Sequence, residues 1–98
     1  MIVLFRTRSL RRAAEEGPEA VRRWGPQVGR RYVQRVQGLR ALARWADAFD
    51  VRTWRLHPLS GRRGSHAIVL TGRWRMEVTP NADANEVIIE EVNNHYGD

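Results

Sequence analysis

Apolar positions recur along the chain with two different periods, and the change of period divides it into a helical part and a β part. From residue 27 to about residue 44, apolar side chains recur every three or four positions, which predicts an amphipathic helix. Two shorter helical segments precede it, because Gly17-Pro18 and Gly25-Pro26 interrupt the pattern and proline favours a helix start. Ser9 is the expected cap of the first of them.

Short apolar runs elsewhere predict strands. Ile2–Phe5 reads as an N-terminal strand. Beyond the long helix, strands are predicted at residues 51–57, 67–70, 73–78 and 87–92, with Gly72 as a tight hairpin position. This order predicts an α+β fold with two to three helices packed on one face of a curved antiparallel sheet. A chain of 98 residues supports one core, so we expect a single domain over residues 1–98.

Strand alternation places cationic side chains on the face of the sheet that the helices leave open. Successive side chains of a strand point to opposite faces. Arg73 and Arg75 alternate with apolar residues in one predicted strand, and Arg55 and His57 alternate with apolar residues in another. If the apolar faces rest on the helices, these four side chains share the open face. Arg62 and Arg63, in the loop "LSGRRGS", are expected at its rim.

Charge is distributed unevenly along the chain, and this distribution indicates the kind of partner to expect. The net charge of +6 combines +8 over residues 1–44, +3 over 45–79 and −5 over 80–98. All 17 basic residues are arginine, which suits bidentate phosphate recognition. A basic body favours a polyanion partner, although an arginine-rich codon usage would give the same composition. The N-terminal apolar run is too short for a signal peptide or a membrane span, so we expect a cytoplasmic location and no membrane partner. There is no cysteine, which excludes disulfides and thiolate metal sites.

Several arginines and a histidine on one open surface suit the chemistry of a phosphodiester. Arginine matches phosphate oxygens and stabilises charge that grows in the transition state, and histidine carries protons near neutral pH. RNA supplies its own nucleophile in the 2′-hydroxyl, so no metal or cofactor is expected. The three histidines lack metal-ligand spacing, and "GRRG" lacks the spacing and lysine of a P-loop.

The stretches "RLHPLSGRRG", "LTGRWRMEV" and "VIIEEVNNHYGD" together resemble the HigB-type toxins, the plasmid maintenance killer branch of the RelE/ParE toxin superfamily. The resemblance is strongest from Arg55 to Asp98 and is compatible with the whole chain. It implies the RelE fold and a type II toxin that enters the ribosomal A site and cleaves mRNA. The 2′-hydroxyl would attack the adjacent phosphate. The implied partners are the ribosome, mRNA and a helix-turn-helix antitoxin of the HigA type.

The resemblance also implies site residues. His57 and His95 match the family's histidines and Arg75 matches the arginine of its "NWR" motif, which implies proton transfer by the histidines and phosphorane stabilisation by Arg75. The open-face and loop arginines, with Tyr96 in the tail, are the candidate RNA contacts (Arg55, Arg62, Arg63, Arg73 and Tyr96).

The chain departs from the family pattern at two places. Ser60 stands where many members have a lysine, so Arg62 or Arg63 would have to replace that phosphate contact. The ending Asn93-Asn94-His95 replaces Asp-Tyr-His. Two alternatives therefore stay open: a ParE-like toxin that poisons DNA gyrase by protein contact, and a basic RNA-binding module without catalysis.

Overall fold

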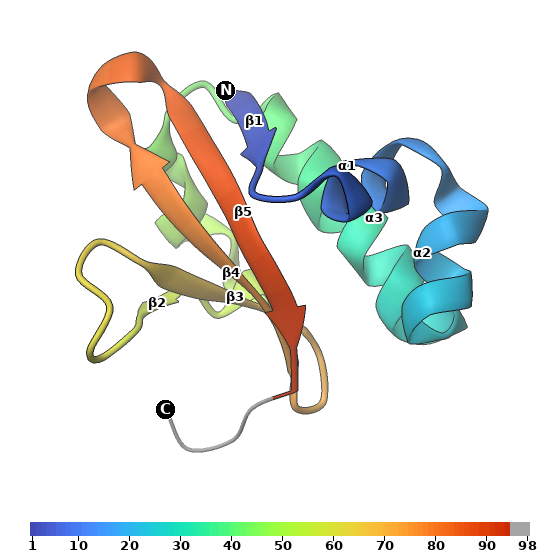
Figure 1. The fold of residues 1–98 in the computed structure, drawn as a ribbon. Helices are drawn as coiled ribbons and strands as arrows, with labels where there is room; N and C mark the ends of the chain where they lie inside the picture. The colour runs from blue at the N-terminus through green and yellow to red at the C-terminus, as the bar shows by residue number, and fades with distance from the viewer. Residues whose placement is uncertain (95–98) are drawn as a thin grey trace.

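The computed structural model describes residues 1–94, in which helices cover one face of a five-stranded sheet (Figure 1). The strands are β1 (Ile2–Phe5), β2 (His57–Pro58), β3 (His66–Thr71), β4 (Trp74–Asn81) and β5 (Glu86–Asn93). The α-helices are α1 (Arg8–Glu15), α2 (Gly17–Trp24) and α3 (Pro26–Ala41). Short 3-10 helices are η1 (Trp45–Asp50), η2 (Arg52–Trp54) and η3 (Ala82–Ala84). The predicted α+β class is confirmed.

The strands lie in the order β1-β5-β4-β3-β2 across the sheet. β2, β3, β4 and β5 pair antiparallel in sequence order, while β1 adds one parallel pairing, with Val3 opposite Val87. A strand that joins the sheet through helices, and not through a hairpin, is free to run parallel to its neighbour. β1 and β2 therefore form the two opposite edges of the sheet.

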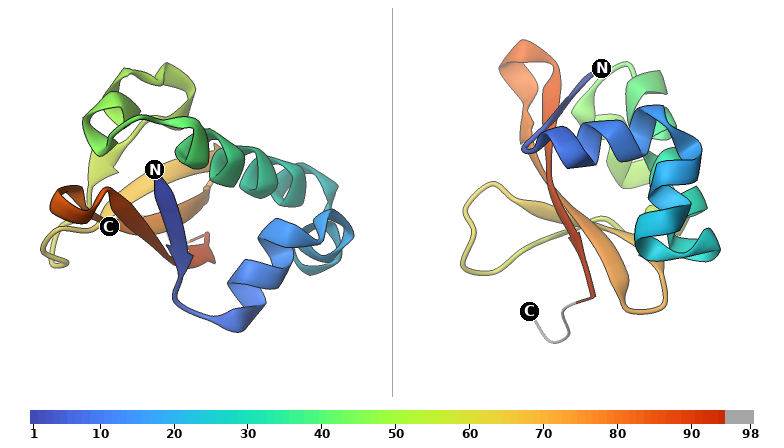
Figure 2. Two further views of the ribbon diagram at one scale, coloured as in Figure 1. Left: turned by 90° about the horizontal axis from the view of Figure 1, so that it is seen from above. Right: turned by 45° about the vertical axis from the view of Figure 1, so that its right-hand side comes forward.

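The helical layer and the sheet share one core. Seen from above, α3 and the 3-10 helices that follow it cross one face of the sheet (Figure 2, left). Tyr32 and Leu39 of α3 are fully buried in the same hydrophobic core as Ile68, Met76 and Ile89 from the three central strands. Alternation along β4 follows the predicted parity, because Met76 joins this core while its neighbours point to the other face. None of the helices between residues 1 and 94 is long and apolar enough to cross a bilayer.

The helix starts follow the predicted proline and glycine punctuation, with one change. Pro18 and Pro26 lie in the first turns of α2 and α3, and Gly25 separates these helices with a φ of +87°. The predicted Ser9 cap is wrong. Thr7 caps α1 instead, because its hydroxyl accepts a hydrogen bond from the Leu10 amide at 3.1 Å.

The predicted strand over residues 51–57 is also wrong. The segment forms η2, then a left-handed turn at Arg55 with a φ of +47°, and only His57 and Pro58 join the sheet. Packing against α3 explains the change. The ring of Trp54 lies against Gly38, so closely that a Cβ at that position would be 2.6 Å from Trp54 Cζ2. Burial of this ring prevails over the local preference for an extended chain.

Candidate functional site

The open face of the sheet, opposite the helices, carries two rows of side chains that come from strands distant in sequence. Opposed residues of antiparallel strands point to the same face. His57 lies opposite Ala67, Ala67 opposite Glu77, and Glu77 opposite Glu91, so one row crosses four strands. The next row contains the residues paired with Arg75, which are Val69 and Asn93.

Glu77 is the centre of the open face and was not among the residues expected to act there. Its carboxylate is buried, with only 2% of the residue exposed. Oε2 accepts hydrogen bonds from Arg75 Nη2 at 2.9 Å and from Asn93 Nδ2 at 2.8 Å. Oε1 accepts from Arg62 Nη1 at 2.7 Å. One carboxylate thus holds two guanidinium groups that come from β4 and from the β2–β3 loop.

Asn93 completes this cluster from β5. Its side-chain oxygen accepts a hydrogen bond from Arg75 Nε at 3.2 Å, and its side-chain nitrogen also donates to Glu91. Arg75 is 7% exposed, so its guanidinium is held by neighbours on two strands rather than extended into solvent. The cluster Arg62–Arg75–Glu77–Asn93 is therefore a fixed hydrogen-bonded unit, which we call the Glu77 cluster.

His57 lies at the β2 end of the same row and is exposed. Its Nδ1 is 2.8 Å from the backbone oxygen of Arg55. Because a carbonyl oxygen only accepts hydrogen bonds, Nδ1 carries the proton in this contact and Nε2 is left as the proton-accepting atom of the neutral ring. The left-handed turn at Arg55 directs this carbonyl. Two strand spacings, about 10 Å, separate the backbones of His57 and Glu77.

The β2–β3 loop supplies one arginine to the open face. It is closed by a hydrogen bond from the Leu59 amide to the Ser65 carbonyl at 2.9 Å. The Ser65 hydroxyl lies 3.0 Å from that of Thr79 on β4, which fixes the end of the loop against the sheet. Both loop arginines are exposed, and Arg62 also contacts the Glu77 carboxylate.

Two of the predicted open-face arginines lie outside the rows. Arg73 is exposed and belongs to the β3–β4 turn, because β4 begins only at Trp74. Arg55 is exposed and precedes β2, in the left-handed turn that the predicted strand did not include. His95 and Tyr96 lie outside the described residues. Of the four cations expected on the open face, Arg75 is buried there and His57 lies at the end of one row. Arg55 and Arg73 lie outside the rows.

The open face also carries acidic groups, which the expected cationic surface did not include. Glu77 and Glu91 both face this side, so the open face alternates positive and negative groups. Further along β5, Glu90 accepts two hydrogen bonds from Arg6, at 2.8 Å and 3.2 Å. The Arg6 guanidinium lowers the pKa of Glu90 below its ordinary range, against the opposing effect of burial. Glu77 was not singled out from the sequence, because its contacts with Arg62 and Asn93 arise only in the fold.

Chemically, the open face combines a partly exposed guanidinium, which can bind an anionic group such as a phosphate, with an exposed imidazole. Arg62 keeps about half of its side chain exposed while one nitrogen is fixed by Glu77. A guanidinium with a fixed orientation presents its other N–H groups to phosphate at little further entropic cost.

No protein family model matches the chain, and no curated protein is similar enough to count as a relative.

Proposed function

We propose that the chain is the toxin of a type II toxin–antitoxin pair, a metal-independent endoribonuclease that cleaves mRNA in the ribosomal A site. The observation that carries the proposal is that His57 and Glu77 lie in one row of the open face, with the other members of the Glu77 cluster gathered around the Glu77 carboxylate. A proton acceptor and oriented guanidinium groups are groups that assist RNA cleavage by its own 2′-hydroxyl, the first as general base and the second by stabilising charge on the phosphorane.

In the proposed reaction, His57 Nε2 takes the proton of a ribose 2′-hydroxyl. The 2′-oxygen then forms a bond to the adjacent phosphorus, and the bond from phosphorus to the 5′-oxygen of the next nucleotide breaks. The 5′-oxygen leaves with a proton, supplied by His95 under the family resemblance. The products are a 2′,3′-cyclic phosphate and a 5′-hydroxyl, so atoms and charge balance without a metal or an added nucleophile.

The guanidinium groups would stabilise the negative charge that gathers on the phosphorane oxygens. Arg62 is the better placed to touch the phosphate directly, since about half of its side chain is exposed. Arg75 lies beneath, where it fixes Glu77 and adds positive potential. Arg55, Arg63 and Arg73 are exposed around the face and are proposed to contact RNA phosphates, which position the strand without reading its sequence.

The proposed partners are the ribosome, mRNA and an antitoxin. The ribosome would hold the mRNA against the open face, and a helix-turn-helix antitoxin would neutralise the toxin in the cytoplasm.

A second candidate is a basic RNA-binding module without catalysis. The burial of Arg75 and its ion pair with Glu77 favour it, because both give this arginine a structural reason to be present. The two candidates differ over His57. Catalysis needs its proton-accepting nitrogen, whereas simple binding needs only the positive potential of the arginines.

The test is inducible expression of the chain without a partner, followed by primer extension on cellular mRNAs. We expect growth arrest and cuts in register with codons, both lost in His57→Gln. Arg30→Gln, an exposed arginine of α3, is the matched control and keeps the cuts. Arg75→Lys and Arg62→Gln test the guanidinium groups, with folding checked by circular dichroism.

Three other outcomes would contradict the proposed function or its mechanism. Cuts that persist in His57→Gln overturn the proposed mechanism. RNA binding without any cut supports the non-catalytic module. Growth arrest with intact mRNA and a DNA damage response supports the gyrase-poisoning alternative.

A further inference from the structure

The free edge of β1 has backbone groups that no strand of the sheet uses. β1 ends the sheet, and on its β5 side the amides of Ile2 and Arg6 donate to the carbonyls of Asn85, just before β5, and Ile89, within it, at 3.0 Å and 2.9 Å. Backbone groups alternate in direction along a strand. The amides and carbonyls of Val3 and Phe5 therefore point away from β5, to the free edge. Such an edge can pair with another extended segment.

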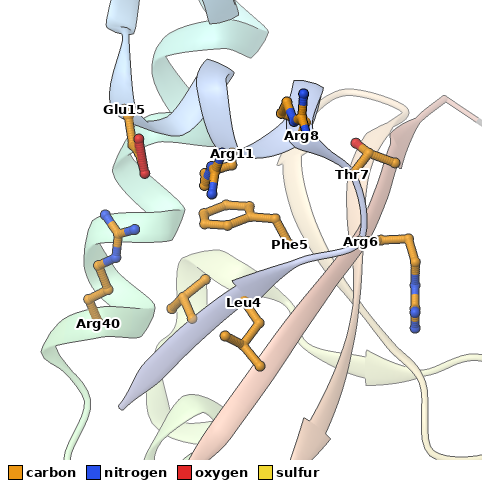
Figure 3. A pocket seen from close by; sticks show the side chains of 9 residues that line it. Leu4, Phe5, Arg6, Thr7, Arg8, Arg11, Glu15 and Arg40 are labelled. Carbon is orange, nitrogen blue, oxygen red and sulfur yellow. The ribbon is translucent and has the colours of Figure 1, made fainter.

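A cleft of about 600 Å³ lies along this edge, between β1 and the helices α1 and α3 (Figure 3). From β1, the side chains of Val3 and Phe5 line the cleft together with part of Leu4. The aromatic ring of Phe5 lies below Arg11 in the figure, with Arg40 on the far side of the cleft. The guanidinium carbon of Arg40 is 5.9 Å from the centre of this ring.

The charge of the cleft is positive. Arg8, Arg11 and Arg40 line it, against Glu15 as its acidic lining residue, and Arg6 at its end is paired with Glu90. None of Arg8, Arg11 and Arg40 forms a salt bridge to another residue within 1–94. These cations surround backbone donors and acceptors of the free edge, and an anionic ligand would neutralise them.

The other side of the same strand is apolar. Ile2 and Leu4 alternate with the core residue Val3, so their side chains lie on the open face of the sheet, 54% and 40% exposed. A segment added beside β1 would alternate in the same way. Every second side chain would meet the arginine cleft, and those between would cover Ile2 and Leu4.

We propose that the free edge of β1 binds an extended acidic peptide segment by strand addition, in which acidic and apolar residues alternate. The backbone of the segment pairs with Val3 and Phe5. Its acidic side chains contact Arg11 and Arg40, and its apolar side chains cover Ile2 and Leu4. Backbone pairing supplies the geometry and the alternating pockets supply the specificity, as in other cases of strand addition.

Charge and shape favour this occupant over two others. A second copy of the chain paired through β1 would bring two sets of these arginines together, which like-charge repulsion disfavours. RNA would satisfy the arginines but offers no ladder to the Val3 and Phe5 amides and nothing apolar for Leu4. The surface lies at the edge of the sheet opposite β2, so the inference does not depend on the function proposed for His57 and the Glu77 cluster.

The test uses fluorescence anisotropy with the full chain and a short labelled peptide that alternates glutamate and valine. We expect saturable binding, and slower amide hydrogen exchange at Val3 and Phe5 when the peptide is present. Arg11→Gln combined with Arg40→Gln should weaken binding about fivefold, the scale of two exposed ion pairs. Arg30→Gln lies on α3 outside this cleft, removes the same type of charge, and should change nothing.

Two control peptides separate strand addition from simple charge attraction. One has methyl groups on the amides that would pair with the edge, and the other groups all glutamates before all valines. Both should lose most of the affinity. Equal binding of the methylated peptide, an equal effect of Arg30→Gln, or no binding of the alternating peptide would each overturn the inference. An unchanged urea midpoint in the double variant confirms that folding is kept, and mRNA cleavage is expected to persist in it.

Discussion

Arg75 and Glu77 lie two positions apart on β4 and form a buried ion pair, with 2.9 Å between Nη2 and Oε2. The spacing of two puts both side chains on the same face of the strand. Neither group is satisfied by the other alone, because Arg62 and Asn93 complete the hydrogen bonds of the carboxylate. The candidate site and part of the stability of the sheet therefore depend on the same carboxylate.

Replacement of Glu77 should lower the free energy of unfolding. Glu77→Gln keeps the shape but removes the negative charge, so Arg75 remains buried without its counter-ion. We expect a loss of about 2–3 kcal/mol in the free energy of unfolding, somewhat below the cost of a fully broken buried pair. Urea denaturation measures it. Asp83→Asn, an exposed acid of η3, is the matched control and should change stability by less than about 0.5 kcal/mol. Equal effects of the two variants would contradict the structural role of the Glu77 cluster.

The contact between α2 and α3 requires a glycine at position 29. A Cβ there would lie 2.6 Å from the Val21 amide nitrogen and 2.7 Å from the Ala20 carbonyl, and backbone cannot move aside as a flexible side chain can. We expect Gly29→Ala to destabilise the protein by about 1–2 kcal/mol, because overpacking outweighs the gain in helix propensity. Gly17→Ala is the control, since a Cβ at that position meets nothing within 4 Å. A thermal melt in which both variants are equally stable would refute this packing argument.

The helices and the later strands could be predicted because their signals are local. The Gly17-Pro18 and Gly25-Pro26 pairs separate the helices in the chain as they do in the structure. Parity along β4 predicted that Arg75 lies on the open face, and the register agrees. The conformation around Trp54 could not be predicted from local signals. Its burial against Gly38 depends on a helix that ends thirteen residues earlier, at Ala41, and no alternation within residues 51–57 encodes that contact.

The partners of the site residues could not be predicted for a related reason. Glu77 is fifteen residues from Arg62 and sixteen from Asn93, so their contacts follow from strand order and register. The expected row of cations assumed that Arg73 belongs to a strand. The β3–β4 turn instead includes it, because the register shifts between Val69 and Thr71 and β4 starts one residue later.

The pair between Arg6 and Glu90 should make stability depend on pH in the acid range. Glu90 has a pKa below its ordinary value of 4.5, mainly because Arg6 donates hydrogen bonds to the ionised form. A carboxyl group with a lowered pKa stabilises the fold above its ordinary value, and this stabilisation is lost as the pH falls through the folded-state pKa. We expect the urea midpoints of the native chain and of Glu90→Gln to differ at neutral pH and to converge below pH 4.5. A difference that persists unchanged in acid would assign the effect to packing and not to charge.

Arg35 links α3 to the sheet beneath the candidate site. It is 4% exposed, and its guanidinium donates to the carbonyls of Val69 at 3.2 Å and Thr53 at 3.5 Å. Burial, with the nearby charge of Arg31, lowers its pKa, and no acidic residue within 1–94 pairs with it. Val69 lies opposite Arg75, so Arg35 supports the strand that carries the second row of the open face.

Removal of this side chain should therefore destabilise the fold despite the cost of burying its charge. Arg35→Ala leaves two carbonyls without their charged donor, and we expect a loss of about 2–3 kcal/mol in the free energy of unfolding. Arg31→Ala, one turn earlier and exposed, removes the same charge and should stay within about 0.5 kcal/mol of the native chain. Urea denaturation of both variants is the measurement. If Arg35→Ala were as stable as Arg31→Ala, the desolvation of the guanidinium would cancel its hydrogen bonds, and Arg35 could not be a support of the sheet.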